Sequence, residues 1–197
     1  MSNLLSGSGA RSTARPKTVI FANSKGGVGK STLALLMGLG LATRHQDASV
    51  KLIDLDPQAT SSDSLRRFCD MRFSVVNDKR LNLADGGPDN ENIVKSIDAE
   101  RNSRYNKRFV VLDSAAGSDP SRSPFLFQCD IMLIPTSVSD ADIFATKKYL
   151  ADLHNLFSTH EIRRTTPPPA LVVLPNLVDS REEFNELRHS LVKEQVY

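Results

Sequence analysis

The sequence predicts an α/β fold of three layers, in which a mainly parallel twisted sheet is flanked by helices. Three observations support this expectation. Short apolar segments that suit strands alternate along the chain with segments of helical periodicity. The apolar segments are continuous, as expected for strands that are buried on both faces of a parallel sheet. A glycine-rich segment that ends in Lys-Ser-Thr directly follows the first apolar segment.

Apolar runs predict the strands, and helical spacing or capping residues predict the helices. Strands are expected at residues 19–22, 49–55, 73–76, 108–113, 130–135 and 170–175. Helices are expected at residues 33–42, near 93–97, from 139 to about 157, and after 180. The third of these begins with Ser139 followed three residues later by Asp142, which is the spacing of a capping box.

The composition suits a single cytoplasmic domain. The chain has 197 residues, of which 40% are hydrophobic and 24% charged, with a formal net charge of +2. This composition excludes wholesale disorder. The longest uncharged apolar segment, residues 33–42, is about half of the ~20 residues that a membrane-spanning helix needs. Two cysteines, Cys69 and Cys129, are too few for a disulfide framework or a four-cysteine metal site.

The first sixteen residues differ in composition from the rest of the chain. They are rich in serine, contain two arginines and lack acidic residues. Such a segment buries too little apolar surface to offset its loss of chain entropy. We therefore expect residues 1–16 to form a flexible basic arm and residues 17–197 to form the folded domain. The arm is either a solvated tail or a contact to nucleic acid, and the sequence leaves both open.

The segment SKGGVGKST, residues 24–32, indicates the chemistry of the protein. Glycines let successive backbone N–H groups curl around phosphate oxygens without Cβ clashes, and the loop delivers the phosphates to the positive end of the next helix. Lys30 then supplies a charge to the β- and γ-phosphates, and the Ser31 hydroxyl is placed to coordinate Mg²⁺. The sequence therefore predicts a P-loop NTPase fold that binds ATP and Mg²⁺. The expected nucleotide-binding residues of the loop are Gly26, Gly27, Val28, Gly29, Lys30, Ser31 and Thr32.

The segment KGGVGKST resembles the deviant Walker A motif of the ParA/MinD ATPase family, and Lys25 matches the signature lysine of that family. The resemblance implies that Lys25 reaches across an ATP-dependent sandwich dimer to the phosphates of the partner. It covers residues 17–188, nearly all of the predicted domain. With one helix after the last strand, where larger relatives carry another strand and a basic helix, the chain resembles the short, ParF-like partition proteins. The sequence leaves open whether the natural chain continues past Tyr197.

A second acidic motif extends the resemblance. LIDLDPQAT, residues 52–60, looks like the D-x-D-P-Q motif of the family. Carboxylates at positions i and i+2 of an extended segment project the same way, toward the strand ends where ligands bind in such sheets. The resemblance implies that Asp56 orients the attacking water and that Asp54 supports the Mg²⁺ shell at Ser31.

Two later positions complete the expected site. Asp113 ends an apolar strand and matches the Walker B aspartate, which holds Mg²⁺ through water. The family places a proline-containing turn after this aspartate, whereas this chain has Ser-Ala-Ala-Gly at residues 114–117, which we interpret as a variant switch loop. Asn176 resembles the family position whose amide contacts the adenine edge, although backbone groups alone could hold the base.

The resemblance implies an ATPase that dimerises on ATP, positions plasmid or chromosomal DNA or another cargo, and is released when a ParB-like or adaptor protein stimulates its weak hydrolysis. Nonspecific DNA binding requires basic surface residues. The candidates are the group Arg101, Arg104, Lys107 and Arg108, and the pair Arg163 and Arg164.

Two other functions use the same fold. A MinD-like membrane-cycling ATPase needs a C-terminal amphipathic helix with a basic face, whereas residues 183–196 carry acids on the polar face. An iron–sulfur reductase needs cysteines near the switch loops, and a small-molecule synthetase gives no role to Lys25. We therefore prefer the partition ATPase and do not expect membrane binding. The cargo, the stimulating partner, and dimer versus filament stay open.

Overall fold

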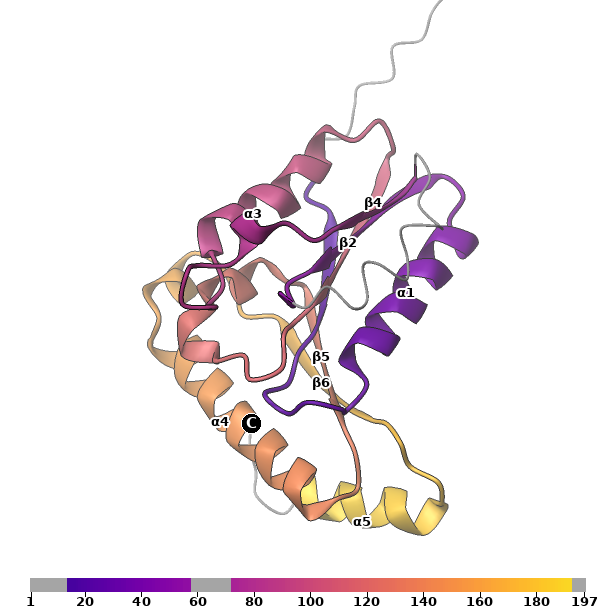
Figure 1. Ribbon diagram of the computed structural model, residues 1–197, viewed down its shortest axis with the longest axis vertical. Helices are drawn as coiled ribbons and strands as arrows, with labels where there is room; N and C mark the ends of the chain where they lie inside the picture. The colour runs from indigo at the N-terminus through magenta and orange to yellow at the C-terminus, as the bar shows by residue number, and fades with distance from the viewer. Residues whose placement is uncertain (1–13, 58–71, 193–197) are drawn as a thin grey trace, which may run out of the picture.

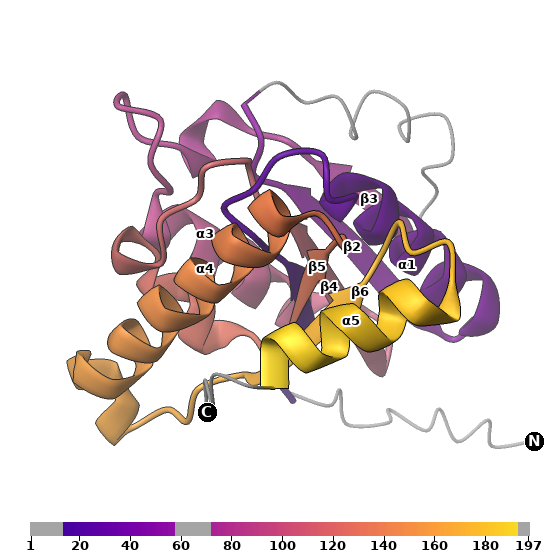
Figure 2. The same ribbon diagram turned by 90° about the horizontal axis from the view of Figure 1, so that it is seen from below.

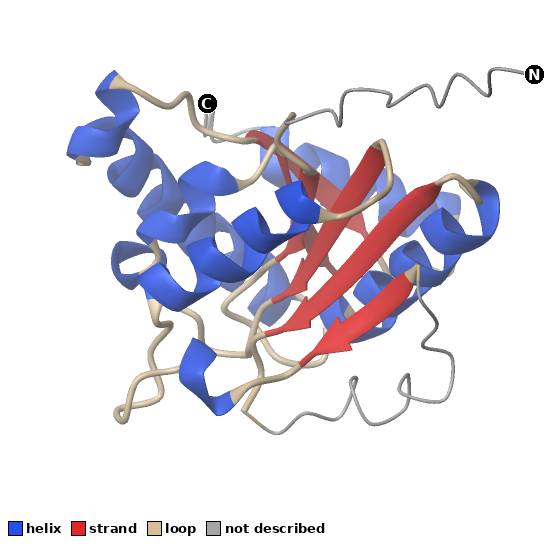
Figure 3. Cartoon of the chain, turned by 90° about the horizontal axis from the view of Figure 1, so that it is seen from above, coloured by secondary structure: helices blue, strands red, loops and turns tan. Residues whose placement is uncertain are grey.

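The structure is a computed structural model that describes residues 14–57 and 72–192. In these residues, six strands form one sheet in the order β3-β2-β4-β1-β5-β6, and every neighbouring pair is parallel. Helix α1 covers one face of this sheet, and α3 and α4 cover the other (Figures 1 and 3). The predicted α/β fold with helices on both faces of a parallel sheet is confirmed.

The observed strands begin and end within two residues of the predicted ones. The strands are β1 (Lys17–Phe21), β2 (Ala48–Asp54), β3 (Phe73–Val76), β4 (Lys107–Asp113), β5 (Ile131–Thr136) and β6 (Ala170–Pro175). The α-helices of the described residues are α1 (Lys30–Arg44), α3 (Asn90–Asp98), α4 (Asp140–Thr159) and α5 (Arg181–Val192). Short 3₁₀ helices connect them at η2 (Lys79–Leu81), η3 (Ala99–Asn102), η4 (Pro120–Arg122), η5 (Pro124–Gln128) and η6 (Glu161–Arg164).

Two apolar clusters form the core, one on each face of the sheet. The larger lies between the sheet and helices α3 and α4, and it includes Ile20, Ile53 and Phe127, which are fully buried. The smaller lies under α1 and includes Phe21 and Phe73. Ile20 and Phe21 are consecutive in β1 and enter opposite clusters, because side chains alternate between the faces of a strand. The continuous apolar runs of the sequence therefore belong to strands that are covered on both sides.

Helix α4 begins where the capping spacing predicts. The Ser139 hydroxyl accepts a hydrogen bond from the Asp142 backbone N–H at 3.2 Å. Asp140 and Asp142 both lie in the first turn, where the positive end of the helix dipole stabilises carboxylates. Figure 2 shows α4 to the left of the sheet and α5 below it, and the two helices contact each other.

The neighbouring strands β1 and β4 lead in opposite directions across the sheet, since β1 is followed by β2 on one side and β4 by β5 on the other. In open α/β sheets, such a reversal leaves a crevice at the carboxyl ends of the strands, where ligands bind. The loop between β1 and α1 opens at this edge. The topology therefore places the glycine-rich segment in the crevice, as the sequence predicts for a phosphate loop.

The predicted arm falls largely on residues 1–13, which lie outside the described residues. The division into an arm and a domain therefore stays a prediction. The three described arm residues lie against the sheet, since Arg15 pairs with Asp130 at 2.6 Å and the Ala14 carbonyl accepts a hydrogen bond from Arg108 at 3.1 Å.

Cys69 also lies outside the described residues, whereas Cys129 is buried, and burial raises the pKa of its thiol. No helix among the described residues is long and apolar enough to cross a membrane.

Candidate functional site

The glycine-rich loop has a backbone that requires its glycines. Gly27 and Gly29 adopt φ angles of 80° and 91°, in the left-handed region that side chains disfavour. A Cβ on Gly29 would also lie 2.3 Å from the amide nitrogen of Asn176. That nitrogen donates to the Val28 carbonyl at 2.9 Å, so residues almost 150 positions apart meet at this loop. The structure thus places Asn176 beside the glycine-rich loop, and its expected contact with the adenine edge stays a prediction.

A pocket of about 290 Å³ lies over the loop and the first turn of α1. Its walls contain most of the predicted phosphate-binding residues, together with Asp56 from the end of β2 and two small residues that follow β4. The residues lining it are Gly26, Gly27, Gly29, Lys30, Ser31, Thr32, Asp56, Ser114 and Ala116. Val28 faces inward, with 1% of its surface exposed, and contributes its carbonyl to Asn176.

Lys30 carries the positive charge of this pocket. Only 6% of its surface is exposed, and burial lowers the pKa of its ammonium group, while the nearby carboxylates of Asp113 and Asp56 act in the opposite direction. Its Nζ donates to the carbonyl of Lys25 at 2.7 Å. A buried cation at the start of a helix, opposite backbone N–H groups, is suited to binding phosphate oxygens.

Acidic residues end two neighbouring strands at the same level. Asp54 closes β2 and Asp113 closes β4; the two are register partners and are 1% and 0% exposed. The expectation that Asp54 and Asp56 project the same way stays a prediction. The Asp54 carboxylate accepts a hydrogen bond from the Asp56 backbone N–H at 3.0 Å, and Asp56 lines the pocket.

The hydroxyl and carboxylate oxygens at this edge are suitable ligands for a magnesium ion that is bound together with a phosphate. The described residues contain no cluster of three or more His, Cys, Asp or Glu side chains that would form a complete metal cage. Mg²⁺ is usually held by one or two carboxylates, substrate phosphates and water, so it does not need such a cage. Ser31 lines the pocket, and Asp113 lies close enough to Lys30 to influence its pKa. The predicted ligands Ser31, Asp54 and Asp113 therefore lie at one edge of the sheet.

Lys25 behaves differently from Lys30. Its side chain is not among those that line the pocket, and 42% of it is exposed. Its Nζ lies 3.7 Å from a carboxylate oxygen of Asp142, in the first turn of α4. The two lysines of the motif therefore point to different places, Lys30 into the loop and Lys25 toward a neighbouring helix.

Sequence reasoning missed Asn23, which anchors the start of the loop. It is fully buried, donates to the Pro135 carbonyl and the Thr146 hydroxyl, both at 2.9 Å, and accepts from the Lys25 N–H at 3.1 Å. An asparagine between a strand and a glycine-rich loop is an available signal, since buried amides require partners. The residues that supply those partners lie more than 100 positions away, and the local pattern does not reveal them.

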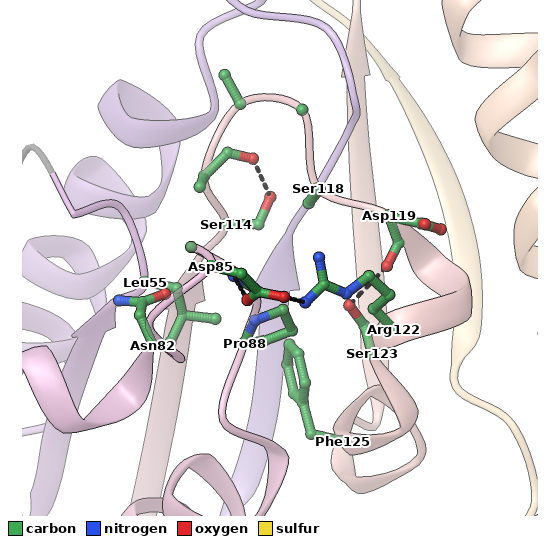
Figure 4. A pocket seen from close by; sticks show the side chains of 15 residues that line it. Leu55, Asn82, Asp85, Pro88, Ser114, Ser118, Asp119, Arg122, Ser123 and Phe125 are labelled. Carbon is green, nitrogen blue, oxygen red and sulfur yellow. Dashed lines mark hydrogen bonds and ion pairs between the residues drawn. The ribbon is translucent and has the colours of Figure 1, made fainter.

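The loop after β4 contacts the glycine-rich loop and borders a second pocket of about 230 Å³ (Figure 4). The Gly117 N–H donates to the Ser24 carbonyl at 2.8 Å. Arg122 pairs with Asp85 at 2.6 Å across the pocket. Ser114 and Ala116 line both pockets, so the two pockets are neighbours. This geometry suits the variant switch loop that the sequence suggests.

In the basic group expected on the surface near residue 104, Arg101, Arg104 and Lys107 are exposed and Arg108 is buried. Arg108 is 4% exposed and donates to the carbonyls of Ala14 and Ser103, so the prediction that it contacts DNA is wrong. Arg101 pairs with Asp98, and Lys107 pairs with Asp47, each at 2.9 Å. In the second group, Arg163 and Arg164 are both exposed in η6.

Comparisons with known proteins agree with this geometry. A family model described as the CobQ/CobB/MinD/ParA nucleotide-binding domain matches residues 19–196. A search of curated proteins gives no match. Among solved structures, apo McdA from Cyanothece is 18% identical, with a TM-score of 0.62 over 90% of this chain and 81% of that chain.

Two further structures have the same fold. The pNOB8 ParA bound to nonspecific DNA is 18% identical, with a TM-score of 0.58 over 92% of this chain and 77% of that chain. The cobyrinic acid a,c-diamide synthase of Mycobacterium smegmatis, with bound ADP and magnesium, is 20% identical. Its TM-score is 0.57 over 90% of this chain and 80% of that chain. At these identities, the likeness establishes the fold alone.

Replacing Lys30 tests the pocket. Lys30→Ala should lose the binding of ATP with Mg²⁺ in calorimetry, because the pocket loses the cation that its walls bury. Lys17→Ala removes the same charge from the exposed start of β1, at the opposite end of the strand, and should leave the affinity unchanged. Thermal unfolding checks that both variants are folded. Wild-type affinity in a folded Lys30→Ala protein would contradict the assignment of the loop.

Proposed function

We propose that this chain, which belongs to the CobQ/CobB/MinD/ParA family of nucleotide-binding domains, is an ATPase that pairs with a second copy of itself on ATP and positions a cargo. In this proposal, ATP with Mg²⁺ holds two subunits face to face, and hydrolysis releases them. The observation that carries the proposal is the orientation of Lys25, which stands in the phosphate-loop motif yet points away from its own pocket.

The orientation of Lys25 favours a role between subunits. Its main chain is fixed on both sides, since its N–H donates to Asn23 and its carbonyl accepts from Lys30. Its side chain remains half exposed at the carboxyl edge of the sheet. A second subunit that faces this edge presents its own triphosphate there, and an ammonium–phosphate contact in a water-poor interface is a strong charge-assisted hydrogen bond. A small-molecule ligase on the same fold gives this lysine no role.

The other predicted site residues bind the nucleotide and Mg²⁺ or orient the attacking water within one subunit. The backbone of residues 26–32 and the Lys30 ammonium bind the phosphates, and Ser31 and Asp113, supported by Asp54, hold Mg²⁺. The ion supplies positive charge to the β- and γ-phosphates. Asp56, on the wall of the pocket, orients a water toward the γ-phosphate and accepts its proton. Asn176 lies beside the loop at Val28, where its amide can meet the base.

We propose that the ATP-bound protein binds nonspecific DNA through basic surface residues. The exposed pair Arg163 and Arg164 remains available on η6, whereas Arg108 is excluded by burial. A partner that stimulates hydrolysis, of the ParB-like or adaptor kind, completes the cycle.

Replacing Lys25 tests whether its side chain is needed for dimerisation. Lys25→Ala should bind ATP as the wild type does and lose ATP-dependent dimers in sedimentation, because the symmetric dimer loses two charge-assisted contacts of about 1.5–3 kcal/mol each. Lys17→Ala serves as the control. Normal dimers of the Lys25→Ala protein in ATP would leave this chain an ordinary phosphate-loop protein and remove the main support for a positioning function.

Replacing Asp56 tests its role in hydrolysis. Asp56→Ala should bind ATP but hydrolyse it slowly, about 10²–10⁴-fold below the wild type if Asp56 acts as a general base. Its ATP dimers should persist longer during sedimentation. Unchanged turnover in a phosphate-release assay would move the catalytic role to another residue, with Asp54 the next candidate.

Replacing the exposed pair Arg163 and Arg164 tests the binding of DNA. The ATP-bound protein should bind DNA with an affinity that falls steeply with added salt, and the double variant Arg163→Glu/Arg164→Glu should weaken binding to all sequences alike and reduce the salt dependence. Lys95→Glu/Lys148→Glu is the matched control, because it reverses two exposed charges that belong to neither candidate group. Fluorescence anisotropy at several salt concentrations measures both effects. Salt-independent binding, or no binding in any nucleotide state, would favour a protein cargo.

A further inference from the structure

The Lys25 side chain has a partner within its own subunit. Its Nζ lies 3.7 Å from Oδ1 of Asp142, and the Asp142 side chain is only 15% exposed. An ion pair at this distance is a charge contact without a good hydrogen bond. Lys25 is therefore neither bound to its own phosphate pocket nor fully solvated.

Asp142 is held firmly by the fold. Its other oxygen, Oδ2, accepts a hydrogen bond from the buried Ser137 hydroxyl, and its backbone N–H donates to the Ser139 hydroxyl. One turn further along α4, Thr146 hydrogen-bonds to Thr136 at 2.9 Å and to Asn23, which in turn accepts from the Lys25 N–H. Hydrogen bonds therefore hold both ends of the Lys25–Asp142 contact, the backbone of Lys25 through Asn23 and the carboxylate of Asp142 through Ser137.

We propose that Asp142 is a positioning residue that keeps the Lys25 ammonium inside its own subunit and thereby opposes the transfer of that ammonium to the triphosphate of a second copy. This inference rests on the proposed function, since it assumes that Lys25 acts between subunits. The contact must break or lengthen when Lys25 moves to a phosphate. Its electrostatic energy is therefore subtracted from the stability of the dimer, once for each subunit.

The loss of a negative charge at Asp142 determines whether the dimer becomes more or less stable. Removing the carboxylate leaves Lys25 with its full positive charge facing the partner, without an internal competitor. A partly exposed ion pair is worth less than about 1 kcal/mol, so the effect per subunit is small, but the symmetric dimer contains two such pairs. We therefore expect a dimer that forms more readily when Asp142 is neutral.

The test uses Asp142→Asn and the matched control Asp140→Asn. Asparagine at residue 142 can still accept from Ser137, and its backbone N–H keeps the Ser139 cap. Asp140 lies in the same first turn and is exposed, so its replacement removes an equal charge from the helix terminus. The two variants differ in the contact with Lys25. Both are compared with the wild type by sedimentation, with magnesium and a non-hydrolysable ATP analogue.

Asp142→Asn should lower the dissociation constant of the dimer by about three- to thirtyfold, whereas Asp140→Asn should leave it near the wild-type value. The affinity of the monomer for ADP should be the same in all three proteins. An unchanged or weaker Asp142→Asn dimer would overturn the inference.

A measurement on the monomer separates this inference from the proposed function. Reductive methylation with ¹³C-formaldehyde labels the lysine amines for NMR, and Lys25→Arg identifies the Lys25 signal. That signal should move in Asp142→Asn and stay in place in Asp140→Asn. If it does not move, the contact and the inference both fail, whereas the proposed function is unaffected. If Lys25→Ala still dimerises normally, the proposed function fails, whatever the NMR result.

Discussion

The common level at which β1, β2 and β4 end is the constraint on which the site depends. Asp113, the last residue of β4, is in register with Phe21 at the end of β1 and with Asp54 at the end of β2. Parallel pairing therefore delivers the phosphate loop, the D-x-D segment and the Walker B carboxylate to one line at one edge of the sheet. A shift of one residue in either pairing would displace a carboxylate by more than 3 Å and turn it to the other face.

Buried charge at this edge is tolerated because opposite charges meet there. Lys30 is desolvated, which lowers the pKa of its ammonium, and the carboxylates of Asp113 and Asp56 offset part of that cost. The other lysine of the motif, Lys25, is partly exposed and lies beside Asp142 in α4. One short loop thus directs two cations to two different surfaces, one of which serves its own pocket and the other of which is available to a second molecule.

Local patterns predicted the strands, the phosphate loop and the start of α4 well, because each depends on residues close in sequence. The cap at Ser139 and the left-handed glycines 27 and 29 are examples. Contacts between distant segments were not predicted, since nothing local encodes them. The burial of Arg108 depends on the carbonyls of Ala14 and Ser103, and the place of Asn23 depends on Thr146.

The central claim is that Lys30 acts on its own subunit's nucleotide and Lys25 on that of the partner. Mixing the Lys25→Ala and Lys30→Ala proteins and measuring phosphate release from ATP tests this most directly. A mixed dimer contains one complete site, with ATP in the Lys25→Ala subunit and an intact Lys25 from the Lys30→Ala subunit. We predict that two nearly inactive proteins gain activity when mixed, with a maximum near equal amounts. A mixture no more active than its separate components would contradict the account.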